Sequence, residues 1–126
     1  ESFNKGVYGK YPHIPCAVYK IEVDEETYQK AKNEVDAMLE NADYYRFNIL
    51  GLWLCGCRIP LNRKRYYFCS QFVSEILKNS NALELPHRPS LMRPSDYTKI
   101  ENLECVFEGK LNELKEQLNT YNKIIA

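Results

Sequence analysis

The chain has 126 residues, which suffices to bury one modest hydrophobic core. Its 17 Lys and Arg residues balance its 17 Asp and Glu residues, and 44% of the residues are hydrophobic. This composition excludes a disordered chain, and the charge balance argues against nucleic acid or a polybasic membrane anchor as the main interaction. We therefore expect one soluble domain over residues 1–126.

The first third of the chain predicts an irregular arm, a strand and a helix. Residues 1–15 combine aromatic residues with Gly and Pro, which is typical of a loop. Alternation over the second half of 17–23 predicts a strand. Asp24 then stands at an N-cap position, two Glu residues follow it, and apolar residues recur at helical spacing. These features predict a helix over about 25–41.

The centre of the chain holds its longest apolar run, residues 49–57, which includes two glycines. A helix that spans a membrane needs about 20 residues, so we expect a short helix or buried segment here and no membrane span. The next segment, 58–65, gathers positive charges around a proline and predicts a solvated basic loop. An apolar stripe then predicts a helix that begins near Cys69 or Ser70 and ends at 79–81.

The last third predicts an extended segment, a strand and a helix. Residues 82–98 are rich in proline, with Asp96 as a turn or cap residue rather than a catalytic acid. Residues 103–108 predict a strand that Gly109 ends. Apolar residues at a 3-4-3-4 spacing predict a C-terminal helix over 111–126 that docks on the core or supports self-association.

The five cysteines are odd in number and irregularly spaced. This pattern argues against a secreted disulfide framework and favours a reducing compartment such as the cytoplasm. A zinc site at Cys55-Gly56-Cys57 would need two more ligands, so we predict no metal and no cofactor, with Cys55 and Cys57 as buried thiols.

Cys69 is the candidate catalytic residue. A thiolate is the reactive form of cysteine, and the first turn of a helix stabilises it through unpaired backbone N–H groups and the helix dipole. The same N–H groups can hold an oxyanion during acyl transfer. On periodicity alone, a small buried cysteine that happens to begin a helix explains the pattern at least as well. Tyr66 or Tyr67 would line the substrate groove, and alternation allows only one of them to do so.

Residues 68–77, Phe-Cys-Ser-Gln-Phe-Val-Ser-Glu-Ile-Leu, resemble the nucleophile helix of the NlpC-type cysteine hydrolases, which have a papain-like fold. The likeness is greatest to their circularly permuted, YiiX-like branch, related to the lecithin:retinol acyltransferase type. Three flanking segments resemble that branch in the expected order: the strand at 18–23, an aromatic-Asn-x-x-Gly segment at 45–52 and a Pro-Ser-x-x-x-Pro-x-Asp segment at 89–96. The resemblance covers about residues 1–110.

The resemblance implies an α+β, circularly permuted papain-like fold with an antiparallel sheet packed on the nucleophile helix. It implies a thiol hydrolase that cleaves a peptide-type amide, such as a cell-wall peptide, or an ester through a Cys69 acyl-enzyme. A lipid acyltransferase or thioesterase-like activity is the alternative. The partner would be a peptide or an acyl substrate, and the sequence does not choose between them.

The histidine of the family's site has no counterpart in this sequence. In the permuted branch it lies on an early His-apolar-Gly strand, whereas His13 lies between prolines and His87 follows Cys69 in Pro-His-Arg-Pro. We expect the histidine and its orienting group to precede Glu1, so that the chain lacks its His-bearing strand. A sheet edge would then be exposed and support oligomerisation. A non-catalytic binding domain with a degenerate hydrolase site is the other reading.

Overall fold

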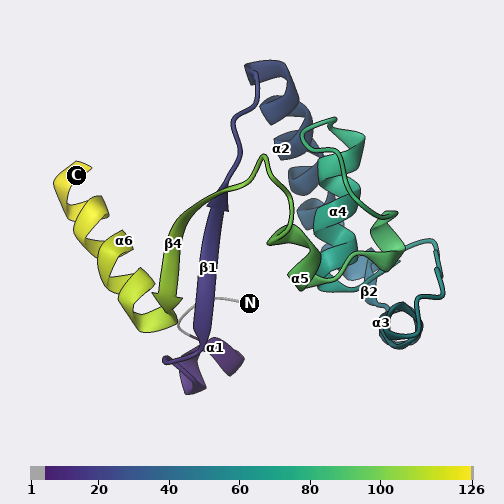
Figure 1. Ribbon diagram of the computed structural model, residues 1–126, viewed down its shortest axis with the longest axis horizontal. Coiled ribbons are helices and arrows are strands. Elements are labelled where there is room, and N and C mark those ends of the chain that lie inside the picture. Colours follow the sequence, from purple (N-terminus) through teal and green to yellow (C-terminus); the bar gives the residue numbers. More distant parts are fainter. Residues whose placement is uncertain (1–4, 126) are drawn as a thin grey trace. The chain divides into compact units, whose positions relative to one another are not determined.

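The computed structural model describes residues 5–125, which form two compact units (Figure 1). The first unit joins the two ends of the chain, up to Lys20 and from Glu104 onward, and the second comprises Ile21–Leu103. Helices and short sheets together make a mixed α+β fold, as the sequence predicts at this coarse level. Among the described residues, none of the helices is both long enough and apolar enough to cross a bilayer.

The first unit is built on two antiparallel strands. β1 runs beside β4, with Pro15 opposite Lys110 and Lys20 opposite Glu104. One helix precedes β1 and another follows β4, and both join the pair at the end where Pro15 lies opposite Lys110. The bounds are α1 (Gly6–Lys10), β1 (Pro15–Lys20), β4 (Glu104–Lys110) and α6 (Leu111–Ile125). The C-terminal helix is thus present as predicted, apart from residue 126, which lies outside the described residues.

Both strand boundaries of the first unit correct the sequence-based prediction. The strand expected over 17–23 begins at Pro15 and ends at Lys20, where its pairing with β4 ends. Gly109 does not end β4, because it lies opposite Cys16 in the ladder. A methyl group at Gly109 would meet the Glu113 carboxylate and the ring of Phe107, so these two side chains would have to shift to admit a larger residue.

The second unit contains two longer helices whose limits follow the sequence closely. α2 (Glu25–Glu40) begins at the predicted cap, where the Asp24 carboxylate accepts a 2.7 Å hydrogen bond from the Thr27 N–H. α4 (Cys69–Asn79) begins at Cys69. It ends where Asn81 adopts a left-handed φ of 57° and the N–H of Ala82 bonds to the carbonyl of Leu77 at 2.9 Å. These two helices confirm the predictions for 25–41 and 69–81.

Shorter elements complete the second unit. α4 packs against α2 and against the 3₁₀ turn η2. β2 and β3 form a two-residue parallel pair directly before α3 and α4, whereas the antiparallel pairing of the structure, β1–β4, belongs to the other unit. The bounds are η1 (Ala42–Tyr44), β2 (Arg46–Phe47), α3 (Ile49–Gly56), β3 (Tyr66–Tyr67), η2 (Pro89–Leu91) and α5 (Pro94–Tyr97).

The core of the second unit is small and unusually polar. Its buried apolar side chains are Cys55, Phe68, Ile76, Leu83 and Met92. Equally buried are polar side chains from α4 and from the segments that precede and follow it: Asn48, Ser70, Gln71, Ser74, Ser80, Ser90 and Asp96. Buried polar groups need hydrogen-bond partners, so the contacts of these residues define how α4 is held.

Candidate functional site

Cys69 is the first residue of α4, and its side chain is exposed. The preceding residue, Phe68, has extended backbone and a side chain only 1% exposed. Its carbonyl accepts the first bond of the helix, from the Phe72 N–H at 2.9 Å. Burial of Phe68 therefore anchors the strand-to-helix turn and leaves the next residue, Cys69, at the surface beside the positive end of the helix dipole.

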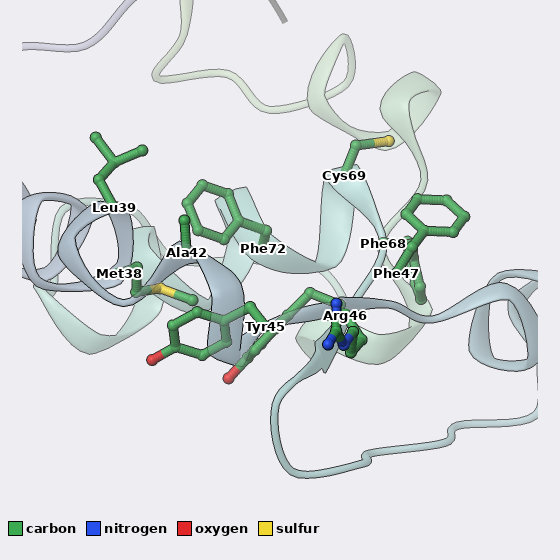
Figure 2. Close-up of a pocket in the computed structure, with 10 residues that line it drawn as sticks. Met38, Leu39, Ala42, Tyr45, Arg46, Phe47, Phe68, Cys69 and Phe72 are labelled. Carbon is green, nitrogen blue, oxygen red and sulfur yellow. The ribbon is translucent and has the colours of Figure 1, made fainter.

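An apolar pocket of about 360 Å³ lies beside Cys69 (Figure 2). The end of α2, the strands β2 and β3 and the first turn of α4 form its wall. Figure 2 shows Met38, Ala42, Tyr45 and Phe72 gathered together, with Cys69 at the margin of this group and its sulfur directed away from Phe72. The lining residues are Met38, Leu39, Ala42, Tyr45, Arg46, Phe47, Tyr67, Phe68, Cys69 and Phe72.

Of the two adjacent tyrosines, Tyr67 lines this pocket. Its ring contacts those of Tyr45 and Phe72, with ring centroids 5.9 and 6.4 Å away. Tyr66 instead lies under the guanidinium of Arg63, which is 4.0 Å from its ring centroid. Burial, with a smaller contribution from the charge of Glu75, raises the pKa of Tyr67. The Tyr67 hydroxyl is therefore protonated at neutral pH and can donate a hydrogen bond.

The face of α4 opposite the solvent is held by hydroxyl groups. The Ser70 hydroxyl donates to the carbonyl of Met92 at 2.8 Å. The carbonyl of Ser70 in turn accepts from the Ser74 hydroxyl at 2.6 Å and from the Tyr97 hydroxyl at 3.0 Å. Burial raises the pKa of Tyr97, and the hydrogen bond with Ser74 offsets part of the rise. These contacts fix the first turn of α4, on which Cys69 lies.

The aromatic-Asn-x-x-Gly segment joins α3 to α4. Asn48 is fully buried and caps α3, because its Oδ1 accepts from the Gly51 N–H at 2.9 Å. Its amide group also donates to the side chain of Gln71 on α4 at 3.4 Å. A Cβ at position 51 would collide with Asn48, so the glycine is required by close approach.

The Pro-Ser-x-x-x-Pro-x-Asp segment closes over the other side of this arrangement. Asp96 is the third residue of α5 and not its N-cap, which is Arg93, but its carboxylate accepts a 2.9 Å bond from the Arg93 N–H in a capping box. The Arg93 guanidinium donates to the carbonyls of Cys55 and Gly56 at 3.0 and 2.9 Å. Arg93 thereby holds the last turn of α3, a role that no sequence pattern predicts.

Within the second unit, the structure does not bring His87 to Cys69. His87 lines a hollow with Lys78 and Asn81 at the C-terminal end of α4. The 11 residues of α4 span about 16 Å, so His87 lies at the wrong end of the helix to take a proton from Cys69. His13 belongs to the first unit and is exposed. Within residues 21–103, no hydrogen bond joins the His87 imidazole to the Cys69 thiol.

The other cysteines differ from the prediction at one position. Cys55 is buried, as expected, but Cys57 is exposed because it follows the last residue of α3 and turns away from the helix contact. All five thiols are free. Across residues 5–125, no three His, Cys, Asp or Glu side chains gather closely enough to hold a metal ion.

The site therefore consists of an exposed thiol on the first residue of a well-anchored helix, an apolar pocket beside it and a tyrosine hydroxyl in the pocket wall. Such a site can attack or bind a substrate that presents a carbonyl group near an apolar group. Comparisons with protein-family models, curated proteins and solved structures found no match to this chain.

Proposed function

We propose that the protein is a thiol hydrolase in which Cys69 is the nucleophile. The observation that supports this most directly is the position of its exposed thiol, on the first residue of α4 and at the edge of an apolar pocket. The resemblance of residues 68–77 to the nucleophile helix of permuted NlpC-type hydrolases supports the same assignment. The fold of that family, with its antiparallel sheet beside the helix, is part of the proposal.

The reaction would proceed in two acyl transfers. A base takes the proton of the Cys69 thiol, sulfur bonds to the substrate carbonyl carbon, and backbone N–H groups of the first turn of α4 hold the oxyanion. The C–N or C–O bond then breaks, and the protonated base returns its proton to the leaving amine or alcohol. Water, deprotonated by the same base, attacks the thioester and releases a carboxylic acid and the free thiol. The resemblance implies that this base is a histidine.

The pocket favours a substrate whose acyl side carries an apolar group. Its wall is formed mainly by aromatic and aliphatic side chains such as Met38, Ala42 and Phe72, which gain free energy by excluding water from an apolar ligand. An apolar side chain of a peptide and a lipid acyl chain both meet this requirement. A lipid acyltransferase would share the first step. In its second step, an acceptor other than water would attack the thioester and take the acyl group.

A non-catalytic binding domain is the second candidate. It is favoured by one observation, that the second unit places its own histidine, His87, beyond hydrogen-bond reach of Cys69. In that case the pocket would bind an apolar ligand and Cys69 would remain a thiol beside it.

Alkylation and ester hydrolysis distinguish the two candidates. We expect iodoacetamide near neutral pH to modify Cys69 faster than Cys57 and Cys105, which are equally free and exposed and serve as internal controls. Hydrolysis of p-nitrophenyl esters should fall by more than about 1,000-fold in Cys69→Ser, because a serine hydroxyl lacks thiolate character. Cys105→Ser should leave it unchanged.

The opposite results are equally informative. Uniform alkylation of the three thiols together with unchanged ester turnover in Cys69→Ser would refute the hydrolase. Saturable binding of an apolar ester without turnover by the unmodified protein would establish the binding domain instead.

A further inference from the structure

Helix α3 buries its small residues and exposes its large apolar residues. Its small residues Gly51 and Cys55 are buried, while Ile49 is 72% and Trp53 69% exposed. Leu50 and Leu52 on the same outer face are exposed too. A helix on the surface of a soluble protein normally turns its large apolar side chains toward the core. The outer face of α3, defined as these four large residues, is therefore an apolar surface that the rest of the second unit leaves exposed.

The orientation of α3 is fixed by contacts at both of its ends. At the N-terminal end, Gly51 lies directly against Asn48, where no larger residue fits. At the C-terminal end, Arg93 donates to the carbonyls of Cys55 and Gly56. Rolling the helix to bury Trp53 would break these contacts and force Gly51 away from Asn48. The exposure of the outer face is thus built into the packing.

Positive charge is concentrated in the segments directly before and after this helix. Residues 44–74 contain no Asp or Glu, although the chain as a whole has no net charge. The Arg46 N–H bonds to the carbonyl of Arg65 at 2.8 Å, which brings the second half of the basic loop beside the start of α3. Figure 1 shows α3 and this loop at the periphery of the second unit. The basic cluster consists of Arg46, Arg58, Arg63, Lys64 and Arg65.

We propose that the outer face of α3 and the basic cluster dock on an anionic membrane surface. The apolar side chains would enter the boundary between headgroups and acyl chains, with Trp53 at the depth that tryptophan favours. The Arg and Lys side chains would contact lipid phosphates, each contributing to the attraction. The neutral overall charge conceals this local excess, which is why composition alone argues against a membrane anchor.

Charge complementarity favours a bilayer over a second copy of the chain. A two-fold symmetric dimer through this face would bring two basic clusters together, and like charges that face one another oppose association. An anionic bilayer instead satisfies both the apolar face and its cationic surroundings. Arg46 and Phe47 also line the pocket beside Cys69, so docking would bring the pocket close to the lipid. The inference stands whether or not Cys69 is a nucleophile.

Trp53 provides the test, because it is the only tryptophan in the sequence. We expect its emission to shift to shorter wavelength when the protein is mixed with phosphatidylcholine–phosphatidylserine vesicles, and to stay unchanged with phosphatidylcholine alone. Replacing Arg63, Lys64 and Arg65 by Gln should weaken the partition into anionic vesicles about 100-fold. Added salt should weaken the binding of the unmodified protein in the same direction.

A pair of matched variants separates this face from general stickiness. Ile49→Ser/Leu50→Ser should abolish co-sedimentation with anionic vesicles, whereas Ile124→Ser/Ile125→Ser, which changes two equally exposed residues of α6, should leave it intact. No wavelength shift of the unmodified protein on anionic vesicles would overturn the proposal. An equal emission shift on neutral vesicles would also overturn it. The same holds for an emission shift that appears without vesicles as the protein concentration rises and the measured mass becomes that of a dimer.

Discussion

Helices α3 and α4 invert the usual relation between polarity and burial, each in its own way. α4 buries Ser70, Gln71 and Ser74, while α3 exposes Ile49 and Trp53. The buried groups of α4 have partners in the carbonyl of Met92, in Asn48 and Asn62, and in Tyr97. Hydrogen bonds and close contacts therefore set the orientation of both helices in this unit. That orientation leaves the large apolar side chains of α3 exposed.

The comparison shows what each helix contributes. Hydrogen bonds are directional, so a polar buried face fixes the rotation of α4 more narrowly than apolar packing would, at the cost that every buried group must keep its partner. α3 is held by the bonds from Arg93 to its backbone carbonyls and by the contact of Gly51 with Asn48. Its large side chains take no part in these contacts and can bind a membrane or another molecule.

Truncating one aromatic residue in each region gives the largest expected contrast. Phe68→Ala should lower the free energy of unfolding by about 3–5 kcal/mol, because it empties a fully buried site at the start of α4. Trp53→Ala should change it by less than about 0.5 kcal/mol, because its side chain is mostly in water. Urea unfolding followed by far-ultraviolet circular dichroism measures both. Similar losses from the two variants would show that the outer face of α3 is buried in solution and would break the comparison.

The hydroxyl network of α4 should give intermediate effects. Ser74→Ala and Tyr97→Phe each remove one hydroxyl from the group around the Ser70 carbonyl, and each should cost about 1–3 kcal/mol. The double variant should cost less than the sum, because the two hydroxyls are 2.6 Å apart and share an acceptor. A double-mutant cycle from urea unfolding measures the coupling. Additive losses would mean that the network does not act as a unit.

We expect the smallest effect on the free energy of unfolding at the N-cap of α2. This helix lies outside the α3–α4 comparison and serves as a reference for it. Hydrogen bonds from Thr27 lower the pKa of Asp24 below its usual 3.8. Its charge therefore stabilises the fold above the unfolded-state pKa, and this contribution is lost as pH falls through the lower folded-state value. Asp24→Asn keeps a capping side chain without a charge. The stability difference between the two proteins should be present at neutral pH and vanish in acid, and a difference independent of pH would exclude the charge as its cause.

The sequence predicted the elements whose signals are local. Asp24 with its two following Glu residues marks the start of α2, and the asparagines at 79 and 81 mark the end of α4, because caps and left-handed turns depend on neighbouring residues. The start of α4 has no such cap signal, so the apolar stripe predicts a start near Cys69 or Ser70 without choosing between them. The limits of β1 and β4 were less predictable, because a strand ends where its partner ends.

The rest of the site depends on contacts between distant residues. Ser70 and Ser74 can be buried because they bond to Met92 and Tyr97, more than 15 positions away in the sequence. The residue pattern of α4 alone does not predict a polar buried face. The pocket joins the end of α2 to β2 and α4, so no periodicity reveals it. Burial of both Cys55 and Cys57 was inferred from the apolar run, but hydropathy does not say which side of a short helix faces the core.

The start of α4 differs from those of α2 and α3 in what its N-cap residue supplies. Asp24 and Asn48 each offer a side-chain oxygen to the first turn that follows, whereas Phe68 offers none. A capping side chain would add about 1 kcal/mol of stability. α4 lacks that stabilisation, because the side chain of its N-cap residue accepts no hydrogen bond from the backbone N–H groups of the first turn. In the proposed reaction, the oxygen that completes this helix end is the carbonyl oxygen of the substrate, so that binding the substrate and capping the helix become one event.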